Sequence, residues 1–205
     1  MFSTRFTSKK NTLSWIDIGT PDDEQTQNRT VTTSVQDDYF WSVSNGGVRF
    51  GEDDTKAFSY ERVEDTGAWV DDGIYTILDT GASDMYMSIL WFDSFVREFY
   101  AAVGIPFEVV EGAAYAACAA NYPNLYFQVE KAWIQVPSED YLVEDDAGTQ
   151  CRLRVVPIDA PFNIFGMPAF LDYYVTHNWE KGYINIGPHA DSLKPEIELA
   201  VKVPE

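Results

Sequence analysis

The stretch that decides the fold runs from residue 77 to residue 83 and reads Ile77-Leu78-Asp79-Thr80-Gly81-Ala82-Ser83. Its apolar start, Ile77-Leu78, is typical of a buried strand, and the acidic Asp79 follows it directly at the beginning of a turn that contains Gly81. A carboxylate in such a place is costly unless hydrogen-bond donors surround it. Gly81 lets the backbone fold back so that amide N–H groups approach Asp79, and Ser83 adds a hydroxyl. The pattern predicts a rigidly held carboxylate that is ionised or poised to ionise.

A similar tripeptide, Asp65-Thr66-Gly67, lies 14 residues earlier in the chain. The residues before it, 62–64, are charged and mixed, and Trp69 stands where the later copy has Ser83. Aspartate and glycine favour turns by themselves. We therefore expect an exposed turn there and place the functional carboxylate at Asp79.

The flanking sequence is typical of a mainly β fold with one or two short helices. Short apolar or alternating runs are separated by Gly, Pro, Asn and Asp clusters, which indicates strands joined by turns. Strands are predicted within residues 1–20 and at 39–43, 48–50, 73–78, 125–129, 132–136, 151–157 and 183–186. An amphipathic helix is predicted at 89–103, where Gly104 ends it, and a second short helix at 168–174.

The charge balance excludes several classes of function. The 205-residue chain has 14 Lys and Arg against 33 Asp and Glu, a formal net charge of −19. Nucleic-acid phosphates and anionic membrane surfaces would repel it. No run approaches the roughly 18 apolar residues that a membrane span needs. We therefore expect no nucleic-acid partner and no membrane span.

No cofactor and no metal site is predicted. The sequence lacks the glycine-rich nucleotide-binding motifs and the zinc-protease motif. His177 and His189 have no cysteine nearby and are poor zinc candidates, so we expect surface or structural roles. The acidic clusters at 52–54, 71–72 and 144–146 lack calcium-loop spacing and are typical of solvated loops.

Beyond residues 77–83, the sequence resembles the pepsin-like aspartic peptidases, specifically their C-terminal lobe. Residues 77–83 look like that lobe's catalytic loop, with Ala82 where Thr is commoner. The similarity continues, in the family's order, through Phe2-Ser3, 15–19, 39–43, Ile164-Phe165-Gly166, 170–175 and 184–187.

The resemblance implies an acid-protease C-terminal lobe over residues 1–190, followed by an acidic C-terminal tail at 191–205. It implies that Asp79 is catalytic, that Gly81 and Ala82 line the substrate site, and that the loop is supported by Thr80, Ser83, Ile164, Phe165 and Gly166. Cys118 and Cys151 stand where the lobe's disulfide partners would.

Three features depart from the family pattern. Met167-Pro168 follows Gly166 where the family usually has an aspartate, and Arg5 falls where a tyrosine is common. The N-terminal lobe, with the second catalytic aspartate and the flap, has no counterpart in this sequence.

The resemblance implies an aspartic endopeptidase that acts on peptide or protein substrates. Hydrolysis of this kind needs two carboxylates that share one proton, and Asp79 supplies only one of them. We expect the second lobe to come from the same precursor or from a companion chain, and we rank a homodimer below both. The alternative is a non-catalytic binding or structural subunit that keeps the fold as a scaffold.

The cysteines bear on localisation. A Cys118–Cys151 disulfide requires an oxidising compartment, whereas two buried thiols would fit the cytosol. No secretory signal is visible at the start of the sequence. We expect a secreted protein or one of the lysosomal or vacuolar lumen, where the sequon at Asn28 would be a weak glycosylation candidate.

Overall fold

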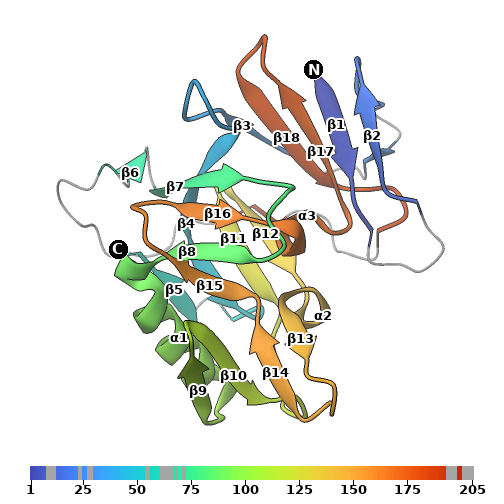
Figure 1. Cartoon of the computed structure of the whole chain (residues 1–205). Coiled ribbons are helices and arrows are strands. Elements are labelled where there is room, and N and C mark those ends of the chain that lie inside the picture. The colour runs from blue at the N-terminus through green and yellow to red at the C-terminus, as the bar shows by residue number, and fades with distance from the viewer. Residues whose placement is uncertain are drawn as a thin grey trace.

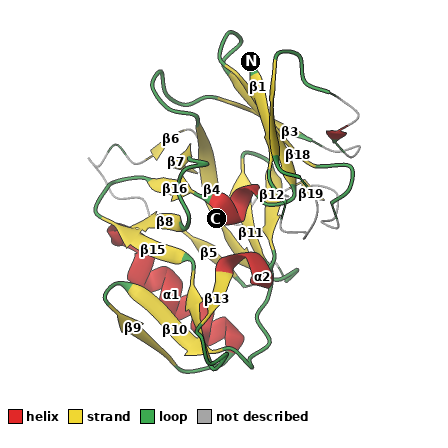
Figure 2. Ribbon diagram, turned by 45° about the vertical axis from the view of Figure 1, so that its right-hand side comes forward, coloured by secondary structure: helices red, strands yellow, loops and turns green. Residues whose placement is uncertain are grey.

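Strands dominate the computed structural model (Figures 1 and 2), which confirms the mainly β prediction. It describes residues 1–7, 13–22, 25–26, 30–53, 56–60, 67, 69–70, 73–192 and 198–199. The strands of these residues form a five-stranded, a four-stranded and a ten-stranded sheet.

The three sheets have the following strand orders. The five-stranded sheet runs β2 (Trp15–Ile18), β1 (Phe2–Arg5), β17 (Tyr173–Asn178), β18 (Tyr183–Pro188) and β3 (Val31–Ser34). The four-stranded sheet runs β13 (Leu142–Glu144), β14 (Gln150–Leu153), β10 (Ala113–Ala117) and β9 (Phe107–Val110). The ten-stranded sheet runs β15 (Val155–Ile158), β8 (Met85–Ser88), β16 (Asn163–Phe165), β7 (Gly73–Leu78), β4 (Ser42–Phe50), β11 (Leu125–Val129), β12 (Ala132–Val136) and β19 (Glu198–Leu199), with β5 (Ala57–Ser59) on β4 and β6 (Trp69–Val70) on β7.

Two parallel pairings distinguish the ten-stranded sheet. Strand β16 runs parallel to β7, with Phe165 in register with Leu78, and β15 runs parallel to β8. Parallel neighbours need long crossover connections. The sheet therefore joins segments that lie far apart in the sequence, and the end of β7 lies between β16, from the last third of the chain, and β4, from the first third.

The long helix α1 (Ile89–Val103) has the predicted bounds. Its buried face includes Trp91, Phe95 and Phe99, and the rings of Phe95 and Phe99 meet the Phe50 ring of β4 edge to face. The Ser88 hydroxyl accepts from the amide of residue 90, and Gly104 ends the helix at φ 77°, a conformation that favours glycine. Burial of this aromatic stripe fixes the helix on the sheet.

Other predictions needed correction. Residues 39–40 lie outside β4, and both side chains are exposed. The predicted strand at 151–157 is divided at Arg154 into β14 and β15. The predicted helix at 168–174 is a single turn, α3 (Met167–Phe170), and residues 173–174 begin β17 because their side chains are buried in the five-stranded sheet.

The remaining helix, α2 (Ser138–Tyr141), precedes β13. Cys118 and Cys151 form a disulfide with a Cα–Cα distance of 4.9 Å, which ties the end of β10 to β14. This part of the molecule lies below the ten-stranded sheet in Figure 1. Of the predicted tail, residues 191–192 and 198–199 are described, and β19 adds an edge strand to β12.

Candidate active site

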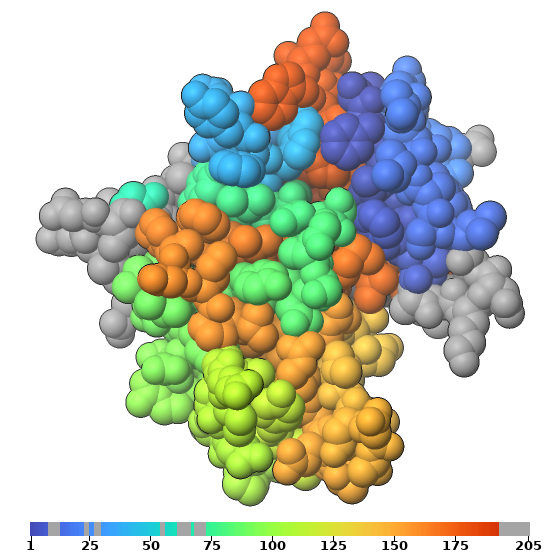
Figure 3. All heavy atoms as spheres, viewed as in Figure 1, coloured from blue at the N-terminus to red at the C-terminus, as the bar shows by residue number. Residues whose placement is uncertain are grey.

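The loop of residues 79–84 joins β7 to β8 and is held by the end of β16 and the start of α3. The Asp79 amide donates to the Phe165 carbonyl (2.9 Å), and the Met167 amide donates to the Ala82 carbonyl (2.8 Å). Within the loop, the Ala82 amide donates to the Asp79 carbonyl (3.2 Å). In Figure 3 the green segment that contains this loop reaches the surface near the centre of the view. The loop is thus fixed at its backbone and open on its outer side.

The Asp79 side chain is exposed and faces away from the core. Its Oδ1 accepts a hydrogen bond of 2.8 Å from the Gly81 amide, as the turn chemistry predicts. Among the described residues, no hydrogen bond joins the Ser83 hydroxyl to Asp79, so that expectation was wrong. One oxygen is therefore fixed by the backbone, and the other can meet a water molecule or a second carboxyl group.

Gly166 allows the loop to pack closely against the end of β16. A Cβ atom at this position would lie 2.0 Å from the Asp84 carbonyl oxygen and 2.7 Å from the Ala82 carbonyl oxygen. Any side chain here would have to displace backbone atoms. The apolar-apolar-glycine pattern is therefore explained by the contact between this segment and the loop.

Apolar side chains lie beside the loop on the same sheet. Ile164 is in register with Ile77 on one side and with Tyr86 on the other, and all three are half-buried. Phe165 points into the core, where its ring meets Phe127 edge to face at 5.0 Å. The alternation places an apolar surface next to Asp79 and anchors β16 from behind.

An ionic cluster that the sequence analysis missed lies at the far end of the loop. Arg152 and Arg154 both contact the Asp84 carboxylate, with N–O distances of 2.9 and 3.0 Å. Burial opposes ionisation of Asp84, but the hydrogen bonds and charges of the two arginines outweigh it and hold its pKa below the usual value. The signal available in the sequence was an acidic residue at the end of the loop, together with two arginines at alternate positions.

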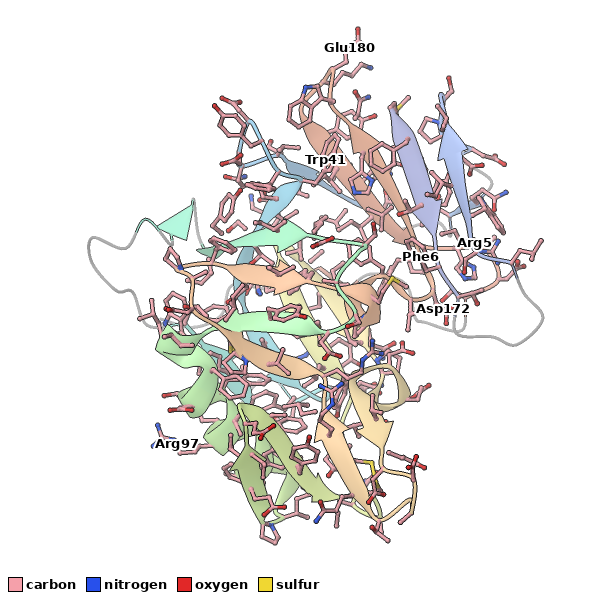
Figure 4. All side chains as sticks on the ribbon, viewed as in Figure 1. Arg5, Phe6, Trp41, Arg97, Asp172 and Glu180 are labelled. Atoms are coloured by element: carbon pink, nitrogen blue, oxygen red, sulfur yellow. A yellow bond between two sulfur atoms is a disulfide. The ribbon has the colours of Figure 1, made fainter. Side chains whose placement is uncertain are left out.

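An aromatic cluster that contains His177 lies next to the end of β7. The Trp41 carbonyl accepts a hydrogen bond from the Leu78 amide (2.7 Å). The His177 ring stacks on the Phe2 ring at 4.5 Å and meets the Trp41 ring edge to face at 5.0 Å. Figure 4 places Trp41 beneath the β17–β18 hairpin, whose tip carries Glu180. His177 is 2% exposed, and its burial lowers its pKa to about 4. The expected structural role of His177 is confirmed.

We expect acid to destabilise the fold through His177. In the unfolded chain His177 is protonated below its ordinary pKa of 6.5, whereas in the folded chain it stays neutral down to about pH 4. The free energy of unfolding therefore decreases as the pH falls between these two values. The loss amounts to about 3 kcal/mol. Urea unfolding at pH 7, 5.5 and 4.5 should show a shallower decline for His177→Phe than for the wild type. Parallel declines would contradict the assignment.

Arg5, where the resemblance to the pepsin-like lobe led us to expect tyrosine, is buried. Its guanidinium lies over the Trp15 ring at 4.1 Å and pairs with Asp191 at 2.9 Å. Close by, buried His189 contacts Asp172 at 3.2 Å. Figure 4 shows Arg5, Phe6 and Asp172 near one another at the base of the five-stranded sheet. Both Arg5 and His189 therefore have structural roles.

The structure brings together residues 79–83 and 164–166, as expected, with Thr80 and Ser83 exposed. The cysteine pair lies away from them. Asn28 and the dipeptide 65–66 fall outside the described residues, and Gly67 is exposed. Within the described ranges no three His, Cys, Asp or Glu side chains gather to hold a metal, and no helix could cross a membrane.

Comparison with known proteins gives one family. A family model described as eukaryotic aspartyl protease matches residues 1–189. A search of the curated proteins finds no match. Because the match spans most of the 205 residues, the chain belongs to the eukaryotic aspartyl protease family.

Proposed function

We propose that this chain supplies one catalytic aspartate, Asp79, of an aspartic endopeptidase whose second aspartate comes from another lobe. The observation that carries the proposal is the geometry of Asp79, which is exposed, held at one oxygen by the Gly81 amide and unencumbered at the other. A carboxylate fixed in this way is preorganised for a partner.

The chemistry follows from two carboxyl groups that share one proton. The ionised group takes a proton from water as that water attacks the scissile carbonyl, while the protonated group donates a hydrogen bond to the carbonyl oxygen. Asp79 can fill one of these roles at a time. The half-buried Ile77 and Ile164 offer an apolar surface beside the reacting atoms for substrate side chains.

The second lobe is proposed to come from the same precursor or from a companion chain, and a homodimer is the variant to test. The competing proposal is a non-catalytic scaffold, which the replacement of the family's aspartate by Met167-Pro168 favours. In this chain Met167 still donates its amide to the loop, and Pro168 is buried in α3. With these residues the segment still holds the loop through its backbone, which supports the catalytic reading.

The Cys118–Cys151 disulfide supports an oxidising compartment. We propose that the protein works outside the cytosol, in a secreted or vacuolar setting. Mass spectrometry of the protein isolated from its source, with and without reductant, tests this proposal. Two free thiols would contradict it.

The function is tested by assaying the chain alone and together with a candidate N-terminal lobe, using a peptide library at acid pH. We expect peptide cleavage only when the second lobe is present, inhibition by pepstatin, and no effect of metal chelators or serine-protease reagents. Activity of the chain alone as a dimer would support the homodimer. Absence of cleavage and of pepstatin binding in every assembly would favour the scaffold.

A further inference from the structure

The catalytic loop has a second support besides the 165–167 segment. Asp84, the last residue of the loop, receives two hydrogen bonds from Arg152, at 2.9 and 3.3 Å, and one from Arg154 Nε, at 3.0 Å. The side chains of Asp84, Arg154 and Arg152 are 14%, 19% and 27% exposed. Charge-assisted hydrogen bonds in such partial burial are stronger and more directional than exposed surface pairs.

Arg154 also contacts the loop backbone directly. Its Nη2 donates to the Ser83 carbonyl, and its Nη1 donates to the Asp140 carbonyl at 3.0 Å. Its own carbonyl accepts from the Met85 amide at 2.9 Å. The guanidinium therefore links the loop to the α2 turn, and the backbone carbonyl of the same residue holds the start of β8. A planar fork with several donors suits the side-chain contacts.

The neighbouring Arg152 has a simpler role. Both of its side-chain hydrogen bonds go to Asp84. It therefore neutralises and orients the carboxylate, whereas Arg154 reaches past the carboxylate to the loop backbone. The two arginines are thus expected to differ in how well lysine can replace them.

We propose that Asp84, Arg152 and Arg154 form an ionic clamp that positions the catalytic loop and thereby Asp79. The inference rests on the proposed function, and the three residues are positioning residues that do not touch the substrate. The 165–167 segment holds residues 79 and 82, and the clamp holds residues 83–85, so the turn is fixed from both ends. Small displacements of a reacting group reduce rates strongly.

The test compares Arg154→Lys with Arg152→Lys in the assembled enzyme. We expect Arg154→Lys to lower kcat about tenfold with KM within about twofold, because the reacting geometry changes while the substrate surface does not. Arg152→Lys should lower kcat less than about threefold. The matched control is Arg97→Lys on the exposed side of α1 (Figure 4), which should leave kcat unchanged.

Hydrogen exchange of the chain alone gives a readout that needs no activity. Arg154→Lys should speed exchange of the Gly81 and Ala82 amides about tenfold and leave β4 and β11 amides unchanged. Unchanged loop exchange and unchanged kcat would overturn the clamp. Faster loop exchange in a chain that shows no peptidase activity in any assembly would confirm the clamp and refute the proposed function.

Discussion

Replacing Asp79 by asparagine is expected to lower kcat of the assembled enzyme on the order of 10³-fold, with little change in KM. Asparagine has nearly the same shape as aspartate, and its side-chain oxygen can still accept the hydrogen bond from the Gly81 amide. It cannot ionise, and so it cannot share a proton with the second aspartate. The loss should therefore appear in the chemical step while the fold is retained.

A matched control for this variant is Asp93→Asn on the exposed face of α1. It removes the same charge at a distance from the loop and should leave kcat within about twofold. The two variants should have the same circular dichroism spectrum and the same free energy of unfolding in urea. If Asp79→Asn retained the activity of the wild type, the catalytic assignment would fall.

Gly166→Ala is expected to destabilise the lobe by about 4 kcal/mol and to abolish activity. The new Cβ would lie 2.0 Å from the Asp84 carbonyl oxygen, and both atoms belong to stiff backbone segments. The loop or β16 must move, and either movement breaks the hydrogen bonds that hold Asp79. Urea unfolding and the peptidase assay measure the two effects.

Gly46→Ala provides the comparison for this substitution. Its Cβ would also come close to a neighbour, at 2.8 Å, but that neighbour is the end of the Gln128 side chain, which can rotate away. We expect a cost below about 1 kcal/mol and unchanged activity. Equal costs for the two alanine variants would show that the approach of Gly166 to the loop has no special importance.

The sequence was most informative where a local pattern and the tertiary structure agree. The stripe of Trp91, Phe95 and Phe99 predicted α1 to the residue, because one buried face and a glycine end determine a helix locally. The Asp79 turn was also predictable, since Gly81 donates to the neighbouring carboxylate without help from distant residues.

Long-range pairing accounts for what was missed. Strands β8 and β16 are only four and three residues long, and their places depend on pairing with β15 and β7. The association of Asp84 with Arg152 and Arg154 spans about 70 residues, and no local periodicity reports it. Tyr39, a strand-forming residue, is 86% exposed before β4 because the strand begins only where its side chains become buried.

The register between Leu78 and Phe165 has a consequence for how the protein is made. These partners are 87 residues apart, so closing the loop between them is slow and entropically costly, and the turn that carries Asp79 cannot be completed until residue 165 has been synthesised. A nascent or prematurely terminated chain would therefore present no finished half-site to a partner. Under the proposed function, the half-site around Asp79 can form only after residue 165 has left the ribosome.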